Sequence, residues 1–135
     1  MLAQREEAEP VRHAVLVLAA APGSAARARR FTQDVLRPMR GSLSMDDLLL
    51  VVSELVTNAV RYGEGGPTLT LHARGGCVRV EVSDRGPLLP TGADPSNEER
   101  GRGLHLIDAL STRWGIDARE PGKAIWAEIA LSPRL

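Results

Sequence analysis

Residues 68–83, TLTLHARGGCVRVEVS, decide the fold of this 135-residue chain. Apolar and polar residues alternate with period two on both sides of Gly75-Gly76, which is a typical two-residue hairpin turn. Pairing across that turn places three apolar pairs on one face of the hairpin: Leu69 with Val82, Leu71 with Val80, and Ala73 with Val78. The opposite face is mostly polar, so the pattern predicts an antiparallel sheet that is covered on one side.

The segments around this hairpin predict the remaining elements. We expect strands at 13–19, 114–118 and 124–130, and helices at 24–39, between Ser44 and Gly63, and at 104–110. Helices grouped over one face of such a sheet give an α+β fold. The expected architecture is a two-layer α/β sandwich with a mainly antiparallel, mixed sheet covered on one face by helices.

Length and composition limit the class of protein. A chain of 135 residues fits one domain, and we expect a flexible leader at 1–10 followed by a single domain at 11–135. The net charge is zero, with 17 basic and 17 acidic residues, so no overall field recruits nucleic acid or anionic lipid. The single cysteine, Cys77, excludes an internal disulfide, and no apolar run approaches a membrane span, which favours a cytoplasmic protein.

The helix that contains SELVTNAVRYG, Ser53 to Gly63, combines an apolar surface with two polar residues one turn apart. Glu54 and Asn58 are separated by four positions, so they share one face of the helix. Burying a carboxylate and an amide without partners costs several kcal/mol. From the helix alone, this face either contacts water or binds a ligand.

Two further segments have the composition of ligand-binding loops. Asp84-Arg-Gly86 follows directly on the second hairpin strand, where a carboxylate can accept a hydrogen bond and a glycine leaves room for a flat ring. Gly101-Arg-Gly-Leu104 precedes a helical pattern, and backbone N–H groups at a helix start favour anions such as phosphate. Between them, residues 87–100 have no periodicity, which is typical of a functional loop or lid.

Taken together, these segments resemble the GHKL (Bergerat-fold) ATPases over residues 12–131. SELVTNAVRYG resembles their N-box, SDRG their Asp-x-Gly box and GRGL their second glycine box. With the ending GKAIWAEI, the chain is most similar to the anti-sigma-factor serine/threonine kinases and their stand-alone actinobacterial relatives. The resemblance implies a Bergerat ATP-binding fold that uses ATP and Mg²⁺.

The resemblance also implies a role for each matched residue. Glu54 matches the general base that orients or deprotonates the attacking hydroxyl, and Asn58 matches the Mg²⁺ ligand. Asp84 matches the carboxylate that reads the adenine amino group, helped by the space at Gly86. The phosphate side of the site matches Gly101, Gly103 and Leu104, with 87–100 as the ATP lid. Mg²⁺ prefers oxygen ligands and few protein groups beside phosphates, which agrees with a single asparagine.

The sequence departs from the family pattern at two places. Pro87 and Leu88 stand where a second glycine is usual, and Lys123-Ala124 stand where a threonine usually lies near the adenine. Trp114 and Trp126 lie in the last two expected strands, and we expect both to fill the core.

Three functions are consistent with these observations. The first is an ATP-dependent serine/threonine kinase that phosphorylates a STAS-type anti-anti-sigma protein and regulates a sigma factor by partner switching. The second is a catalytically weak, nucleotide-gated module that sequesters a regulator without phosphorylating it. The third, a histidine kinase catalytic domain, is disfavoured because no dimerisation helix with a phosphoacceptor histidine is present. We expect neither nucleic acid nor membrane as a direct partner, and kinases of this type commonly form homodimers.

Overall fold

The computed structural model describes residues 12–42, 45–87 and 98–130. The elements follow the expected order of strand, helix, helix, two strands, helix and two strands. Their bounds are β1 Arg12–Val17, α1 Ser24–Val35, a 3₁₀ helix η1 Arg37–Ser42, α2 Met45–Tyr62, β2 Thr68–Arg74, β3 Cys77–Asp84, α3 Glu98–Leu110, β4 Arg113–Arg119 and β5 Gly122–Ala130. The expected leader at 1–10 and most of the expected lid at 87–100 lie outside the described residues.

The five strands form one sheet in the order β1-β2-β3-β5-β4. Each of the four neighbouring pairs is antiparallel, so the parallel pairing that a mixed sheet allows does not occur among the described strands. The predicted hairpin register is confirmed, with Leu71 opposite Val80. Gly75 has a φ of 59°, a left-handed conformation that suits the first central position of the turn.

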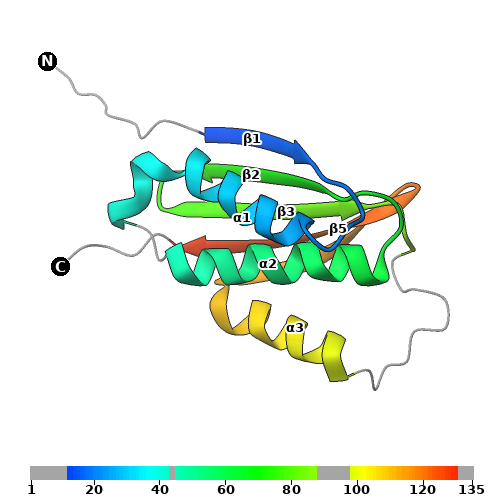
Figure 1. Cartoon of the computed structure of the whole chain (residues 1–135). Helices are drawn as coiled ribbons and strands as arrows, with labels where there is room; N and C mark the ends of the chain where they lie inside the picture. The colour runs from blue at the N-terminus through cyan, green and yellow to red at the C-terminus, as the bar shows by residue number, and fades with distance from the viewer. Residues whose placement is uncertain (1–11, 43–44, 88–97, 131–135) are drawn as a thin grey trace, which may run out of the picture.

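The helices cover one face of the sheet, as Figure 1 shows. Helix α2 lies across β3 and β5, and it contacts α1 on one side and α3 on the other. The two-layer α+β arrangement predicted from the hairpin is therefore confirmed. The other face of the sheet has no helix over it among the described elements.

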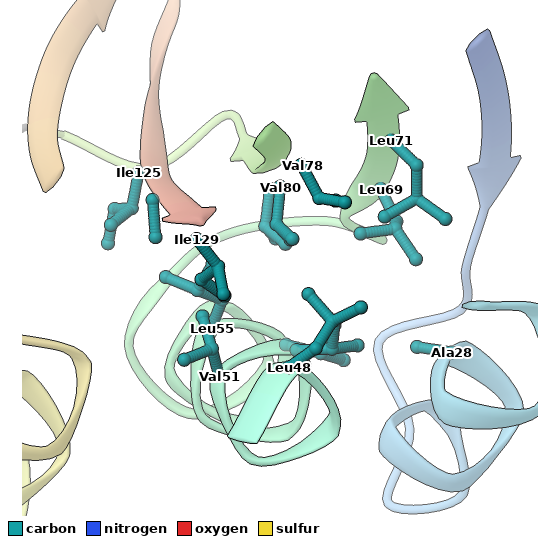
Figure 2. Close-up of a cluster of buried hydrophobic side chains, with 14 of the residues drawn as sticks. Ala28, Leu48, Val51, Leu55, Leu69, Leu71, Val78, Val80, Ile125 and Ile129 are labelled. Carbon is teal, nitrogen blue, oxygen red and sulfur yellow. The ribbon is translucent and has the colours of Figure 1, made fainter. Parts of the chain in front are cut away.

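The core lies between α2 and the inner face of the sheet (Figure 2). Val51 and Leu55 of α2 point toward Ile129, and Val78 and Val80 line the sheet above them. All five side chains are at most 3% exposed. Fully burying such a side chain contributes about 1.5–3 kcal/mol, so this cluster fixes α2 against the sheet.

Two helix boundaries differ from those predicted. Helix α1 ends at Val35, and η1 follows from Arg37, because Pro38 has no N–H to continue the α-helical hydrogen bonds. Helix α3 begins at Glu98, six residues earlier than expected. The sequence Glu98-Glu99-Arg100 consists of good helix formers, and glutamate is favourable in a first turn.

One tryptophan is in a different place from the one predicted. Trp114 is partly buried against the core, and its indole N–H donates to Asp108 at 2.9 Å. Trp126 instead lies on the face of the sheet away from the helices, with the Arg79 guanidinium 4.3 Å above its ring. Its neighbours Ile125 and Ala127 take the core positions, because successive side chains of a strand alternate between faces.

In the described part of the chain, no helix is long and apolar enough to cross a membrane.

Candidate functional site

Asp84 is the centre of a polar cluster at the end of β3. Its Oδ1 accepts a hydrogen bond of 2.6 Å from the Gly86 N–H and lies 3.4 Å from the Glu64 nitrogen. The backbone N–H of Arg85 donates to the Glu64 carbonyl at 3.1 Å. These contacts join the end of β3 to the segment that follows α2, so they fix the carboxylate at the C-terminal end of that helix.

Two glycines make this close approach possible. A Cβ at Gly63 would lie 2.5 Å from the Asp84 Cγ, and a Cβ at Gly86 would lie 2.9 Å from Oδ1. Side-chain carbons do not approach so closely, so any larger residue at either position would displace the carboxylate. Gly63 was predicted only as a helix-ending residue. Gly86 was predicted to leave room beside Asp84, and it also supplies the shortest hydrogen bond to that carboxylate.

Lys123 completes the cluster from β5, directly opposite Asp84 in the sheet register. Its Nζ donates to Asp84 Oδ1 at 3.0 Å, and the two side chains are only 3% and 2% exposed. A buried charge is tolerated only when it is paired, and here each charge compensates the other. The sequence indicated that Lys123 departs from a familiar pattern. It did not indicate that this lysine, the only one in the chain, is buried and paired with Asp84, the carboxylate predicted to bind adenine.

Asn58 is a buried polar residue of α2 without a full set of partners. The residue is 7% exposed, and its Nδ2 has no hydrogen-bond partner. Leaving a buried donor unpaired costs about 1–3 kcal/mol, which is unusual in a helix that is otherwise so well packed. Glu54, one turn earlier, is partly exposed, and its side chain has no hydrogen bond or ion pair with another described residue. The neighbouring Ser53 accepts a hydrogen bond of 2.9 Å from Arg29 of α1.

The predicted residues therefore follow one another along α2. With a rise of about 1.5 Å per residue, Asn58 lies about 7.5 Å and Glu54 about 13.5 Å before the Gly63 end, where Asp84 contacts the helix. The carboxylate and the amide on α2 are thus followed, beyond the end of the helix, by the carboxylate of Asp84 from β3. This order can accommodate an extended ligand with a base at one end and anionic groups toward the other.

Two hollows lie beside these residues. One, of about 500 Å³, is lined by Asp84 and Lys123 with Leu18, Gly66 and Gly122 among others, and it has the volume of a small-molecule pocket. The other, of about 340 Å³, lies between α1 and α2, and its lining includes Val56, Thr57 and Val60. Neither is lined by Glu54 or Asn58 in the part of the chain that the structure describes.

The second glycine segment is not the loop that the sequence predicted. Because α3 begins at Glu98, Gly101 and Gly103 lie inside its first two turns, and not ahead of its N-terminus. That prediction was wrong for the boundary of the helix. Only the first four N–H groups of a helix lack an intrahelical partner, so Gly101 can still present its N–H to an anion and Gly103 cannot. Leu104 is partly buried and contacts the hydrophobic core. No group of three His, Cys, Asp or Glu that could hold a metal is present among residues 12–42, 45–87 and 98–130.

The sequence matches a known domain family over most of its length. Residues 18–129 match the family described as "Histidine kinase-like ATPase domain". The match includes every residue that the sequence analysis assigned to the site.

Two curated relatives share more than a third of their aligned residues with this chain. The sensor histidine kinase component HK1 of Mycobacterium tuberculosis is 36% identical over 87 residues, which are 55% of this chain and 52% of HK1. An uncharacterised protein of Streptomyces coelicolor is 36% identical over 90 residues, which are 62% of this chain and 86% of that protein. The chain therefore spans about half the length of HK1.

Two solved structures have a similar fold. The crystal structure of the RsbU and RsbW domains of Rv1364c from Mycobacterium tuberculosis aligns with a TM-score of 0.70 and 25% identity, over 93% of this chain and 34% of that one. Acinetobacter baumannii histidine kinase AdeS aligns with a TM-score of 0.54 and 13% identity, over 89% of this chain and 68% of AdeS. The second likeness shows the fold alone.

Proposed function

Because this chain belongs to the family of histidine kinase-like ATPase domains, the GHKL group that its motifs resemble, we propose that it is an ATP- and Mg²⁺-dependent serine/threonine protein kinase of the anti-sigma type. The observation that carries this proposal is the buried, unpartnered Asn58 amide on the same helix whose end contacts Asp84. A ligand with a base and a phosphate chain would satisfy both groups.

The residues present suit Mg·ATP. The carbonyl oxygen of Asn58 is a ligand type that Mg²⁺ prefers, and its unpaired Nδ2 can donate to a phosphate oxygen. Asp84 would accept from the adenine amino group, and Gly101, Gly103 and Leu104 would lie on the phosphate side. When bound, Mg²⁺ neutralises charge that develops on the phosphates. The chain's own residues position the nucleotide along α2.

Glu54 is the group proposed to orient the attacking hydroxyl. Its carboxylate is one helical turn from Asn58, it is partly exposed, and it has no hydrogen bond or ion pair with a described residue. A carboxylate in this position can accept the proton of a serine or threonine hydroxyl from a partner protein. A module that only binds nucleotide would not need this group.

The proposed partners follow from the structural relative. Rv1364c combines an RsbU domain and an RsbW domain in one protein, which supports a regulator that works through protein partners. We infer a STAS-type anti-anti-sigma protein as the phosphate acceptor and a sigma factor as the alternating partner, in the cytoplasm and without direct contact to nucleic acid or membrane. We propose that residues 11–135 form one histidine-kinase-like ATPase domain and that this domain can form a homodimer.

Transfer of labelled γ-phosphate to a STAS-type protein from the same genome tests this proposal. We expect acid-stable label, because phosphoserine and phosphothreonine survive acid treatment and phosphohistidine does not. Glu54→Gln should reduce the transfer rate at least 100-fold while Mg·ATP binding stays within a factor of three, since general-base catalysis contributes roughly 10²–10⁴-fold. The matched control is Gln33→Ala, an exposed change on α1.

Three results would count against the proposal. Acid-labile label would favour a histidine kinase domain, and equal transfer by Glu54→Gln and wild type would remove the assigned base. Tight nucleotide binding with no transfer to any STAS-type protein would favour the nucleotide-gated binding module, for which the unusual Lys123 is the structural argument.

A further inference from the structure

Lys123 is the buried cation of the candidate site, and not all of its N–H donors have a hydrogen-bond partner among the described residues. An ammonium group carries three donors and no acceptor. Among the described residues only one of these donors has a partner, Asp84 Oδ1 at 3.0 Å. The side chain is 3% exposed, so water does not surround the other two.

Only one of the two oxygen atoms of the Asp84 carboxylate accepts hydrogen bonds from described residues. Its Oδ1 accepts from Gly86 and Lys123 and lies near the Glu64 N–H. Its Oδ2 has no partner in the part of the chain that the structure describes. The pair therefore presents an unfilled acceptor and unfilled donors side by side, and its two side chains are at most 3% exposed. Both residues are among those that line the hollow of about 500 Å³, whose lining also includes outer-face residues such as Thr68 and Ser83.

The edge of adenine has the complementary arrangement. Its exocyclic amine is a donor, and the neighbouring ring nitrogen N1 is an unprotonated acceptor. We propose that Lys123 reads the nucleobase, with its ammonium donating to N1 of adenine while Asp84 accepts from the adjacent amine. This inference rests on the proposed ATP site. It assigns nucleobase recognition to Lys123, a residue at which the sequence differs from the family pattern.

The geometry also explains why a lysine serves this position. Asp84 holds the ammonium group in place by one hydrogen bond. The side chain of Lys123 therefore loses little conformational entropy when its remaining N–H groups bind a nucleobase. The long side chain is anchored in the sheet, where Lys123 lies opposite Asp84. Without a ligand, the two side chains neutralise each other's charge but leave hydrogen-bonding groups unpaired. Bound adenine would pair with a free N–H of Lys123 and with the free Oδ2 of Asp84.

The test compares ATP with 1-deaza-ATP, in which a C–H group replaces N1 and the amine is kept. For the wild type, we expect 1-deaza-ATP to bind roughly 10- to 100-fold more weakly than ATP, because a hydrogen bond to a charged donor is lost. In Lys123→Met the two nucleotides should bind equally. In Lys123→Thr, which keeps a hydroxyl donor, part of the discrimination should return.

A second measurement needs no variant. Lys123 is the only lysine, so a chain labelled with ¹⁵N-lysine gives a single side-chain ammonium signal. We expect that signal to shift on addition of Mg·ATP and to shift differently with Mg·1-deaza-ATP.

The possible results separate this inference from the proposed function. Equal binding of ATP and 1-deaza-ATP to the wild type would overturn the role of Lys123 while leaving an ATP site in place. Tighter ATP binding by Lys123→Met would also overturn it, since the lysine would then block the base. No binding of either nucleotide by the wild type would overturn the proposed function itself.

Discussion

Strands β3 and β5 carry ion pairs on both faces of the sheet, and the two sets differ in exposure and in redundancy. On the helix side, Asp84 and Lys123 form a single pair that is almost fully buried. On the open side, Glu128 is paired with Arg79 at 3.2 Å and with Arg113 at 2.6 Å, and Arg113 is 70% exposed. The same two strands thus hold one isolated buried pair and contribute to one shared, more exposed network with arginines of β4.

The difference supports the proposed role of the buried pair. In the outer network Glu81 also has two arginine partners, Arg79 and Arg119, so the loss of one arginine leaves each carboxylate with another. Exposed ion pairs contribute little, because water screens them. A buried pair costs desolvation, and apolar residues of similar volume would often be as stable. The buried charges of Asp84 and Lys123 therefore fit the proposed ligand recognition better than a role in stability alone.

The largest expected effect is on the buried pair. Lys123→Met should lower the free energy of unfolding by about 3–5 kcal/mol at neutral pH, because it leaves the Asp84 carboxylate buried without its counter-charge. Urea unfolding followed by circular dichroism measures this change.

Two matched variants sharpen the comparison of the faces. Arg113→Met, which removes the same type of charge on the outer face, should move the urea midpoint only slightly, since Arg79 still contacts Glu128. The double variant Asp84→Asn with Lys123→Met should recover most of the lost stability. Equal destabilisation by Lys123→Met and Arg113→Met would contradict the distinction drawn between the two faces.

A smaller effect is expected on the pH dependence of the outer network. The Arg113 guanidinium, which donates a hydrogen bond of 2.6 Å, holds the pKa of Glu128 below the usual 4.5. The folded state therefore binds this proton less readily than the unfolded state. The stabilisation is present above pH 4.5 and is lost as the pH falls through the lowered pKa.

Glu128→Gln should remove this dependence. The difference in unfolding free energy between wild type and Glu128→Gln is expected to be constant from pH 7 to about pH 5 and to shrink below pH 4.5. Urea unfolding at a series of pH values measures it. A difference that grows on acidification would show that the carboxylate is not stabilised by the arginines in its charged form.

Much of the fold could be predicted because its pattern is local. The alternation around Gly75-Gly76 determined the hairpin register, and the apolar surface of α2 determined where that helix packs. The position of Trp126 was not predictable in this way, because its outer-face place depends on Arg79 and Arg113, which come from two other strands.

The candidate site was predictable in part. Asn58 and Asp84 were predicted from motif order, and the structure brings Asp84 to the end of the helix that carries Asn58. The contact of Lys123 with Asp84 was not predicted, because it depends on the pairing of β5 with β3 and joins two side chains that are 39 positions apart in the sequence. The early start of α3 was missed because Gly101 and Gly103 masked the helix-forming residues before them.

The most direct test of the nucleotide site is calorimetric titration of Mg·ATP into the wild type, Asn58→Ala and Leu50→Ala. Leu50 is an exposed residue of the same helix, so its variant controls for a general change in α2. We expect one binding site per chain in the wild type and in Leu50→Ala, and binding at least tenfold weaker in Asn58→Ala. Binding of equal strength by Asn58→Ala and wild type, or no binding by the wild type, would contradict the assignment of this end of the molecule as an ATP site.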